Sequence, residues 1–246
     1  MGPQRSQKTM RAFQCYEKRG RRMARTKRSI KGAAMKSQED QMNLDLAENA
    51  FIDPSFEITR QLARDCRACH LWERATQTVF GEGPVPAPVG LIGEQPGDKE
   101  DLAGRPFVGP AGLKLNEALQ EAGVERQKVY VTNAVKHFKY VPRGKIRLHQ
   151  KPVTVEIKAC RQWLERELDV VQPKVAVAMG ATAVQSLFGK AMPINKNRGR
   201  LIDLGSCQAL ITIHPSYLLR IQEEADAQAE YARFVSDLKL LLPFLG

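Results

Sequence analysis

The chain has 246 residues, of which 43% are hydrophobic, so it is long enough to bury one core and to carry an additional segment. It contains no run of about 18 apolar residues, and its first residues lack the apolar core of a secretory signal. We therefore expect a cytoplasmic protein without membrane partners, in which the five cysteines are reduced and clustered ones serve as metal ligands.

Most of the net charge of +11 lies in the first 40 residues, which contain twelve Lys and Arg residues and three acidic residues. We assign residues 1–48 to a basic, disordered extension and residues 49–246 to one folded domain. Within the extension, residues 19–28 are a candidate for nonspecific phosphate binding. A solvated tail without a specific role and a transit peptide are the alternatives.

The elements of the domain follow from hydrophobic periodicity. Amphipathic spacing predicts a first helix over residues 56–71, which carries Cys66 and Cys69. Short apolar runs predict strands at residues 89–92, 129–132, 174–179, 201–204 and 209–213. Further helices are predicted at residues 113–122, 154–168 and 223–242, and another follows Gly180.

Strands that alternate with helices predict the α/β class. We expect a three-layer α/β/α sandwich around a central, mostly parallel sheet of four strands. Residues 138–153 interrupt this alternation, because they form a basic segment with Pro and Gly and show no clear periodicity.

Three cysteines are candidate metal ligands. Cys66 and Cys69 have the spacing of a chelating pair, and Cys160 lies in a predicted helix. The candidates for a fourth ligand are His70, His137 and Cys207. Three Cys and one His suit a structural zinc site or an iron–sulfur cluster equally, and unligated core cysteines are the alternative. The string from Cys66 to His70 also fits a c-type haem attachment site, which normally forms outside the cytosol.

Polar side chains follow three predicted strands where each strand ends. Glu94 follows the first strand, Asn133 the second and His214 the last. Because open α/β sheets bind ligands at the carboxyl ends of their strands, these side chains predict one site. The loop after the first strand adds the carboxylates of Asp98, Glu100 and Asp101, for which simple solvation is the alternative.

The phosphate-binding signals favour nucleic acid over nucleotides. The chain has neither a Gly-x-Gly-x-x-Gly string nor a Walker loop, so dinucleotides and nucleoside triphosphates are not supported. Helices that begin near Gly109 and Gly180 present free N–H groups, which suit the phosphates of a nucleic-acid backbone.

Four ordered strings of residues resemble the iron–sulfur uracil-DNA glycosylases over about residues 60–242. The strings are Gly-Glu-Gln-Pro-Gly-Asp-Lys-Glu-Asp from Gly93, Arg-Pro-Phe-Val-Gly from Arg105, Thr-Asn-Ala-Val-Lys-His from Thr132, and His-Pro-Ser-Tyr-Leu-Leu-Arg from His214. Within that superfamily the chain looks most like the UdgX branch, whose loop typically reads Lys-Arg-Arg-Ile-His. Here the loop reads Lys-Ile-Arg-Leu-His from Lys145, so that Ile146 replaces a basic residue.

The resemblance implies a role for each matching residue. It implies a 4Fe-4S cluster, with zinc as the alternative, held by Cys66, Cys69, His137 and Cys160. The implied catalytic residues are Glu94, His149 and His214. The implied substrate-binding residues are Gln95, Asp98, Asp101, Phe107, Asn133, Ser216 and Arg220. The implied DNA-binding residues are Lys145 and Arg147.

The resemblance also implies an activity for the domain at residues 49–246. It implies that a monomer excises uracil from DNA, including single-stranded DNA. The protein then becomes covalently linked to the abasic site through His149, so that each chain acts once. An iron–sulfur uracil-DNA glycosylase with multiple turnovers is the first alternative. The second is a nonenzymatic nucleic-acid-binding domain stabilised by a metal.

Overall fold

The computed structural model describes residues 54–246, so the predicted extension at residues 1–48 lies outside the described residues. The elements in chain order are α3 (Pro54–Arg64), η1 (His70–Glu73), β1 (Val89–Gly93), α4 (Asp98–Ala103), α5 (Pro110–Ala122), η2 (Arg126–Lys128), β2 (Val129–Asn133), β3 (Tyr140–Arg143), β4 (Ile146–His149), α6 (Thr154–Val171), β5 (Val175–Met179), α7 (Ala181–Phe188), α8 (Ile194–Asn197), β6 (Leu201–Asp203), β7 (Gln208–Thr212), α9 (Pro215–Leu218), α10 (Glu224–Lys239) and η3 (Leu242–Phe244). Within this part of the chain, no helix is both long and apolar enough to cross a membrane.

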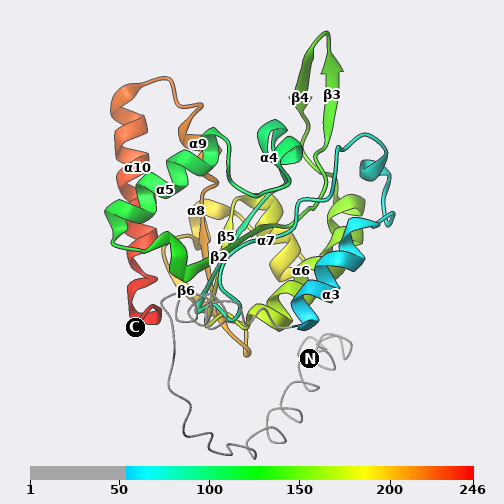
Figure 1. Cartoon of the computed structure of the whole chain (residues 1–246). Coiled ribbons are helices and arrows are strands. Elements are labelled where there is room, and N and C mark those ends of the chain that lie inside the picture. The colour runs from blue at the N-terminus through cyan, green and yellow to red at the C-terminus, as the bar shows by residue number, and fades with distance from the viewer. Residues whose placement is uncertain (1–53) are drawn as a thin grey trace, which may run out of the picture. The chain divides into compact units, whose positions relative to one another are not determined.

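A mostly parallel sheet forms the centre of the domain (Figure 1). Its strand order is β2-β1-β5-β7-β6, and only β6 runs antiparallel to its neighbour. The sheet thus has five strands instead of the expected four, because the short segment β6 joins its edge. Every residue of β1, β2 and β5 is buried, which is typical of parallel strands that are covered on both faces.

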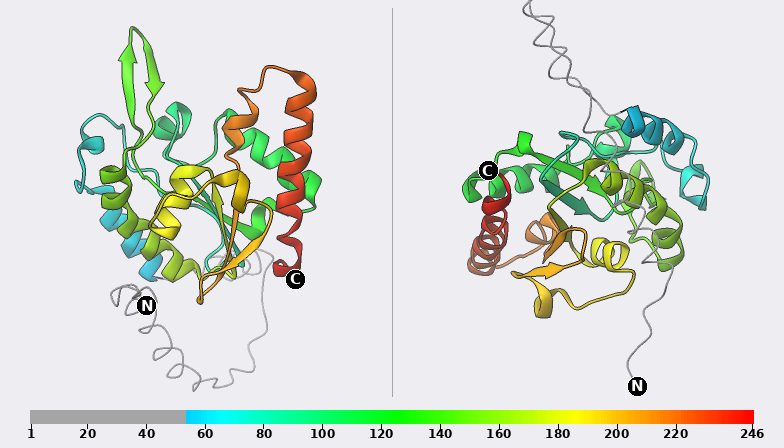
Figure 2. Two further views of the ribbon diagram at one scale, coloured as in Figure 1. Left: turned by 180° about the vertical axis from the view of Figure 1, so that it is seen from behind. Right: turned by 90° about the horizontal axis from the view of Figure 1, so that it is seen from below.

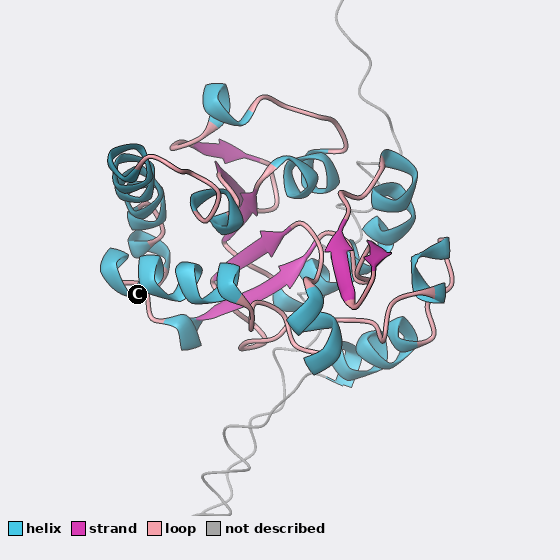
Figure 3. Ribbon diagram, turned by 90° about the horizontal axis from the view of Figure 1, so that it is seen from above, coloured by secondary structure: helices cyan, strands magenta, loops and turns pink. Residues whose placement is uncertain are grey.

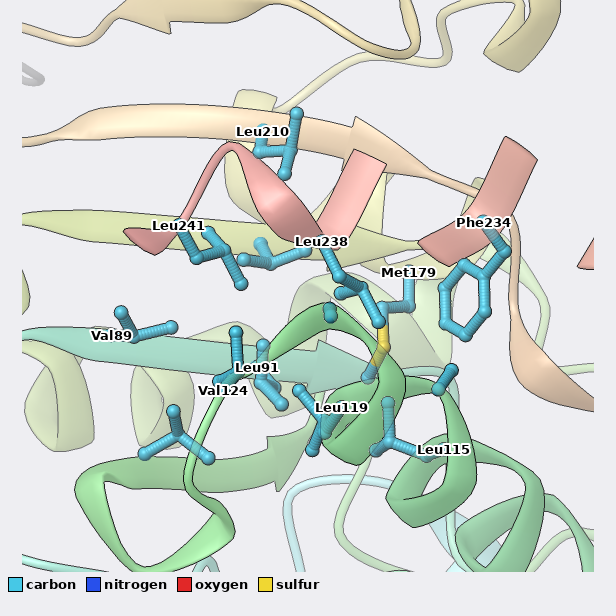
Figure 4. Packing of buried hydrophobic residues seen from close by; sticks show 14 of the residues in the cluster. Val89, Leu91, Leu115, Leu119, Val124, Met179, Leu210, Phe234, Leu238 and Leu241 are labelled. Atoms are coloured by element: carbon cyan, nitrogen blue, oxygen red, sulfur yellow. The ribbon is translucent and has the colours of Figure 1, made fainter. Parts of the chain in front are cut away.

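Helices cover both faces of the sheet and complete the predicted three layers. On one face, apolar residues of β1, β2, β5 and β7 pack against α5 and α10, as Figure 4 shows for Leu91, Leu119 and Leu238. On the other face, the strands pack against α6 and α7, and α3 lies against α6. The view from behind shows the same arrangement (Figure 2).

The first predicted helix is shorter than its periodicity indicated. Helix α3 ends at Arg64 instead of residue 71, and the 3-10 helix η1 begins only at His70. Cys66 and Cys69 therefore lie in the turn between them and not on a helix. The turn brings Cys66 into the apolar layer of α6, where its Sγ accepts a hydrogen bond of 3.0 Å from Nε1 of Trp163.

The aperiodic segment at residues 138–153 contains an antiparallel hairpin. Strands β3 and β4 pair from Tyr140 opposite His149 to Arg143 opposite Ile146. The turn needs Gly144, whose φ is +60°. The hairpin projects from the carboxyl edge of the sheet, and because most of its side chains face solvent it lacks the alternation of a half-buried strand (Figure 1).

Candidate active site

The carboxyl ends of the parallel strands bring the three predicted strand-end residues to one edge of the sheet. Figure 3 shows the ribbon of the domain from above. Gly93 at the end of β1 lies directly beside Asn133 at the end of β2, and Glu94 follows Gly93. His214 follows β7 and is the N-cap of α9. Helix α4 and the hairpin rise from the same edge (Figure 1).

Gly93 lets two side chains approach the end of β1. A Cβ atom at this position would lie 2.4 Å from Oδ1 of Asn133 and 2.6 Å from Cζ of Phe107, so no larger residue fits. The amide of Asn133 and the ring of Phe107 therefore lie side by side over the strand end. The side-chain amide of Asn133 forms no hydrogen bond with any described residue, so its N–H donors and its oxygen acceptor are available to a ligand.

The loop that carries Phe107 is held in a strained conformation. Phe107 has a φ of 56°, which a bulky residue rarely adopts. The carboxylate of Glu100 fixes the loop by accepting hydrogen bonds from the backbone N–H of Gly109 at 2.7 Å and of Gly97 at 3.1 Å. The Phe107 ring stacks on the ring of His214 with 6.1 Å between centroids, so both rings form one wall.

Glu94 connects three elements of the site. Its Oε1 lies 3.4 Å from Nε2 of His149 at the end of β4, and its Oε2 accepts a 2.7 Å hydrogen bond from Thr182 in the first turn of α7. Partial burial is the main cause that lowers the pKa of His149; the cationic Arg220 adds to this, and Glu94 opposes it. The imidazole of His149 is consequently neutral at pH 7 and carries a free lone pair.

His214 is also neutral, with a defined donor. The pKa of His214 is lowered to about 4, mainly by burial and to a smaller extent by the neighbouring His149 and Arg220. The backbone N–H of Ser216 donates to Nδ1 at 3.2 Å, so the ring proton of the neutral imidazole is assigned to Nε2. Ser216 therefore orients His214. Arg220 is exposed, and its side chain forms no hydrogen bond or ion pair with any described residue, so its guanidinium is available to a phosphate.

The amide of Gln95 closes the base of the hairpin, and the binding of substrate by this residue stays a prediction. Its Nε2 donates to the carbonyl of Lys139 at 3.2 Å and to the carbonyl of Gln150 at 3.0 Å, and its Oε1 accepts from the N–H of Lys139 at 3.1 Å. These contacts connect both ends of the hairpin to Gln95, which directly follows Glu94. The Gln95 amide thus fixes where the hairpin starts relative to the catalytic candidates.

Arg147 forms ion pairs with both Asp98 and Asp101. The guanidinium of Arg147 donates to Oδ2 of Asp101 at 2.6 Å and to Oδ1 of Asp98 at 2.5 Å, and it lies 5.2 Å from the centre of the Tyr140 ring. Asp101 is fully buried and also accepts from Thr76. This network fastens the hairpin to α4, and the roles of these three residues in DNA and substrate binding stay predictions.

The two faces of the hairpin separate His149 from Ile146. Alternate residues of a strand share a face, so His149 lies on the same face as Arg147. Ile146 lies on the other face together with Arg143, its partner directly opposite in the antiparallel pair. Ile146 is 63% exposed. The replacement of a basic residue by Ile146 therefore leaves the support of His149 unchanged, and Lys145 at the turn stays exposed.

The three cysteines meet in the apolar layer between α3 and α6. Cys66 and Cys160 are buried there and Cys69 packs against the same cluster. Besides the contact of Cys66 with Trp163, the N–H of Lys136 donates to Sγ of Cys160 at 3.2 Å. Burial raises the pKa of the Cys160 thiol to about 12, so a thiolate at this position requires a compensating positive charge.

The predicted fourth ligand lies beside this layer. His137 is buried next to Lys136, and its Nε2 lies 2.9 Å from the hydroxyl of Thr78. His70 is exposed and Cys207 packs in another cluster. Within the described residues, no three His, Cys, Asp or Glu side chains stand close enough to hold a metal as they are. The donor set nevertheless fits an iron–sulfur cluster or zinc, because it combines three thiols and one imidazole at an apolar layer with N–H groups that donate to sulfur.

Sequence reasoning missed two residues that organise the site. Thr182 orients Glu94, and its place at the first turn of a helix after a strand was a usable signal. Glu100 was noticed only as a loop carboxylate, although its two backbone contacts build the Phe107 loop.

The family model described as "Uracil DNA glycosylase superfamily" matches residues 80–239. A type-4 uracil-DNA glycosylase of Thermotoga maritima is 41% identical over 166 residues, which cover 67% of this chain and 83% of that protein. A type-4 uracil-DNA glycosylase of Sulfurisphaera tokodaii is 34% identical, with 66% and 73% covered. A type-5 uracil-DNA glycosylase of Pyrobaculum aerophilum is 27% identical, with 67% and 77% covered.

Proposed function

Because this chain belongs to the uracil-DNA glycosylase superfamily, we propose that it cleaves the N-glycosidic bond of uracil in DNA. The convergence of Asn133, Phe107 and His214 at the strand ends is the observation that carries this proposal. These groups supply a base-reading amide, an aromatic wall and a hydrogen-bond donor. Enzymes that act on a base need such a pocket, because the base must leave the stack before its bond can be reached.

Asn133 is the residue that selects uracil. Uracil presents the N3–H donor beside the O4 acceptor, and the Asn133 amide can match both with its oxygen and its nitrogen. Cytosine presents the opposite pattern, so the same amide disfavours it. The Phe107 ring stacks on the extruded base.

His214 and Glu94 stabilise the charges that develop as the bond breaks. The bond between C1′ and N1 breaks with its electron pair moving to uracil, and the proton on Nε2 of the neutral His214 donates toward uracil O2. The sugar becomes positively charged, and the carboxylate of Glu94 stabilises that charge. Donors of this kind are typically worth about a hundredfold or more in rate.

His149 captures the sugar, as the resemblance to the UdgX branch implies. The lone pair of its neutral imidazole forms a bond to C1′, and the resulting imidazolium is stabilised by Glu94, which lies 3.4 Å from Nε2 of His149 in the free protein. The network of Arg147 and the amide of Gln95 support this by holding the hairpin over the site. A water molecule in place of His149 would give ordinary turnover.

The DNA backbone lies along the exposed cationic groups of this edge. Arg220 is near enough to lower the pKa of both histidines and keeps its donors free, and Lys145 projects at the tip of the hairpin. Single-stranded DNA is included as a substrate, because its bases need not be unpaired before they enter the pocket. We also retain the expectations of a monomer and of a cytoplasmic location.

The proposed cofactor is a 4Fe-4S cluster held by Cys66, Cys69, His137 and Cys160. When bound, it supplies a structural link between the turn after α3, the segment after β2, and α6. Because His137 directly precedes the segment that leads to the hairpin, this link also supports the position of β3.

Protein purified without oxygen is expected to be brown and to contain about four irons per chain, measured by metal analysis. Replacing Cys160 with Ser removes one ligand and is expected to abolish the colour and the bound iron. Replacing Cys207 with Ser is the matched control and should change neither, because Cys207 packs in a different cluster. A colourless wild-type protein with one zinc per chain would contradict the iron–sulfur assignment.

Release of free uracil tests the proposed activity. Oligonucleotides of one sequence that differ only in carrying uracil, cytosine or thymine are incubated with the protein, and free base is measured by chromatography. We expect release from the uracil strand alone. Binding of all three strands without release of base would favour the nonenzymatic alternative.

A further inference from the structure

A fully buried ion pair lies directly behind Asn133. The side chains of Lys136 and Glu167 are both 0% exposed and form a salt bridge through Nζ and Oε2. Nζ of Lys136 also donates to the hydroxyl of Thr132 and to the backbone carbonyl of Asn133, both at 2.7 Å. All three Lys136 donors thus end on β2 or on the helix that covers it.

The carboxylate of Glu167 is equally saturated. Its Oε1 accepts from the N–H of Gly81 at 2.9 Å, from the hydroxyl of Tyr130 at 2.8 Å and from the hydroxyl of Thr132 at 3.0 Å. Four groups, one from the loop at Gly81 and three from β2, are therefore fixed around one pair of charges. Removing two charges from water is costly, and apolar residues of similar size often give equal or higher stability, so stability alone does not account for this pair.

We propose that Lys136 and Glu167 are positioning residues that fix Asn133 for the selection of uracil. The inference rests on the proposed function of Asn133. The ammonium group holds the main-chain carbonyl of Asn133, while the N–H of the same lysine donates to Sγ of Cys160 at 3.2 Å. The main chain of Asn133 is thereby fixed on the side of α6, and its side-chain amide keeps one orientation beside the Phe107 ring.

The test replaces the pair without leaving a buried charge. In the variant Lys136→Met with Glu167→Gln, the glutamine oxygen can still accept from Gly81 and Tyr130, but the carbonyl of Asn133 loses its donor. The matched control is Arg198→Met with Asp237→Asn, which removes a buried ion pair between the α8–β6 loop and α10, while Glu230, the second partner of Arg198, keeps its ion pair with Arg233. The asparagine oxygen there can still accept the 2.6 Å hydrogen bond from Thr212.

Three readouts separate a positioning role from a role in stability alone. The single-turnover rate of uracil release at saturating DNA is expected to fall roughly tenfold to a hundredfold in the test variant, because a displacement of about 1 Å costs on that order. The control is expected to stay within about twofold of wild type, and the affinity of both for uracil-free DNA is expected to be unchanged. Hydrogen exchange at residues 129–137 is expected to quicken only in the test variant.

Several results would overturn the proposal. Unchanged exchange at residues 129–137, a wild-type rate, or an equal loss of rate in the control would each do so. If the double variant does not fold, Thr132→Val is the second test, because it removes only the hydroxyl between the two charges. This variant is expected to slow uracil release roughly threefold to tenfold, and an unchanged rate would refute the positioning role of Lys136 and Glu167. A wild-type protein that releases no uracil would contradict the proposed function. The hydrogen-exchange measurement would still test whether Lys136 and Glu167 fix the end of β2.

Discussion

Replacing His149 with Ser is expected to convert a protein that captures its product into one that releases it. The serine removes the imidazole and opens space for water, while Asn133, Phe107 and His214 are untouched. Uracil release is therefore expected to continue within about tenfold of the wild-type rate, and water, instead of the imidazole, captures C1′. A denaturing gel of protein mixed with uracil-containing DNA is expected to show an abasic strand and no crosslinked band.

The control for this variant is Ile146→Ser, on the opposite face of the same strand. It is expected to form the crosslink in wild-type yield. A crosslink that persists in the His149 variant would mean that another residue is the nucleophile. In the wild type, acidification below the lowered pKa of His149 is expected to reduce the yield, because a protonated imidazole has no lone pair to donate.

Glu94→Gln is expected to depress both uracil release and crosslinking by about a hundredfold or more. The amide has nearly the shape of the carboxylate, and its oxygen can still accept from Thr182, so geometry is largely kept while the negative charge is lost. Stabilisation of the sugar cation precedes the step at which imidazole and water compete. Single-turnover rates of base release and of crosslink formation measure the two outcomes on one sample.

Glu117→Gln is a suitable control, because Glu117 is an exposed carboxylate on α5 that pairs with Lys114. Both rates should match the wild type. If Glu94→Gln releases uracil at the wild-type rate and loses only the crosslink, then Glu94 assists His149 and does not stabilise the shared cation.

The alternating elements of the fold could be predicted because the buried strands and amphipathic helices carry strong periodicity. The hairpin could not, because Pro142, Gly144 and the exposed Ile146 break any alternation. Its position depends on distant contacts, such as that of Gln95 with Lys139 and Gln150.

The strand-end residues of the site were predictable from position alone, since parallel strands end at one edge. The partners of charged groups were not predictable. Asp98 and Asp101 resembled ligand-binding carboxylates, but they pair with Arg147, which lies far along the chain. The same limit hid the buried pair of Lys136 and Glu167, whose members lie on separate elements.

The intact mass of the wild-type protein after mixing with a uracil-containing oligonucleotide tests the central claim most directly. Under denaturing conditions we expect one species with the mass of the protein plus the oligonucleotide less uracil, in an amount that does not exceed one per protein chain. Peptide mapping should place the modification on His149. Unmodified protein together with abasic DNA in molar excess over protein would contradict covalent capture and would favour ordinary turnover.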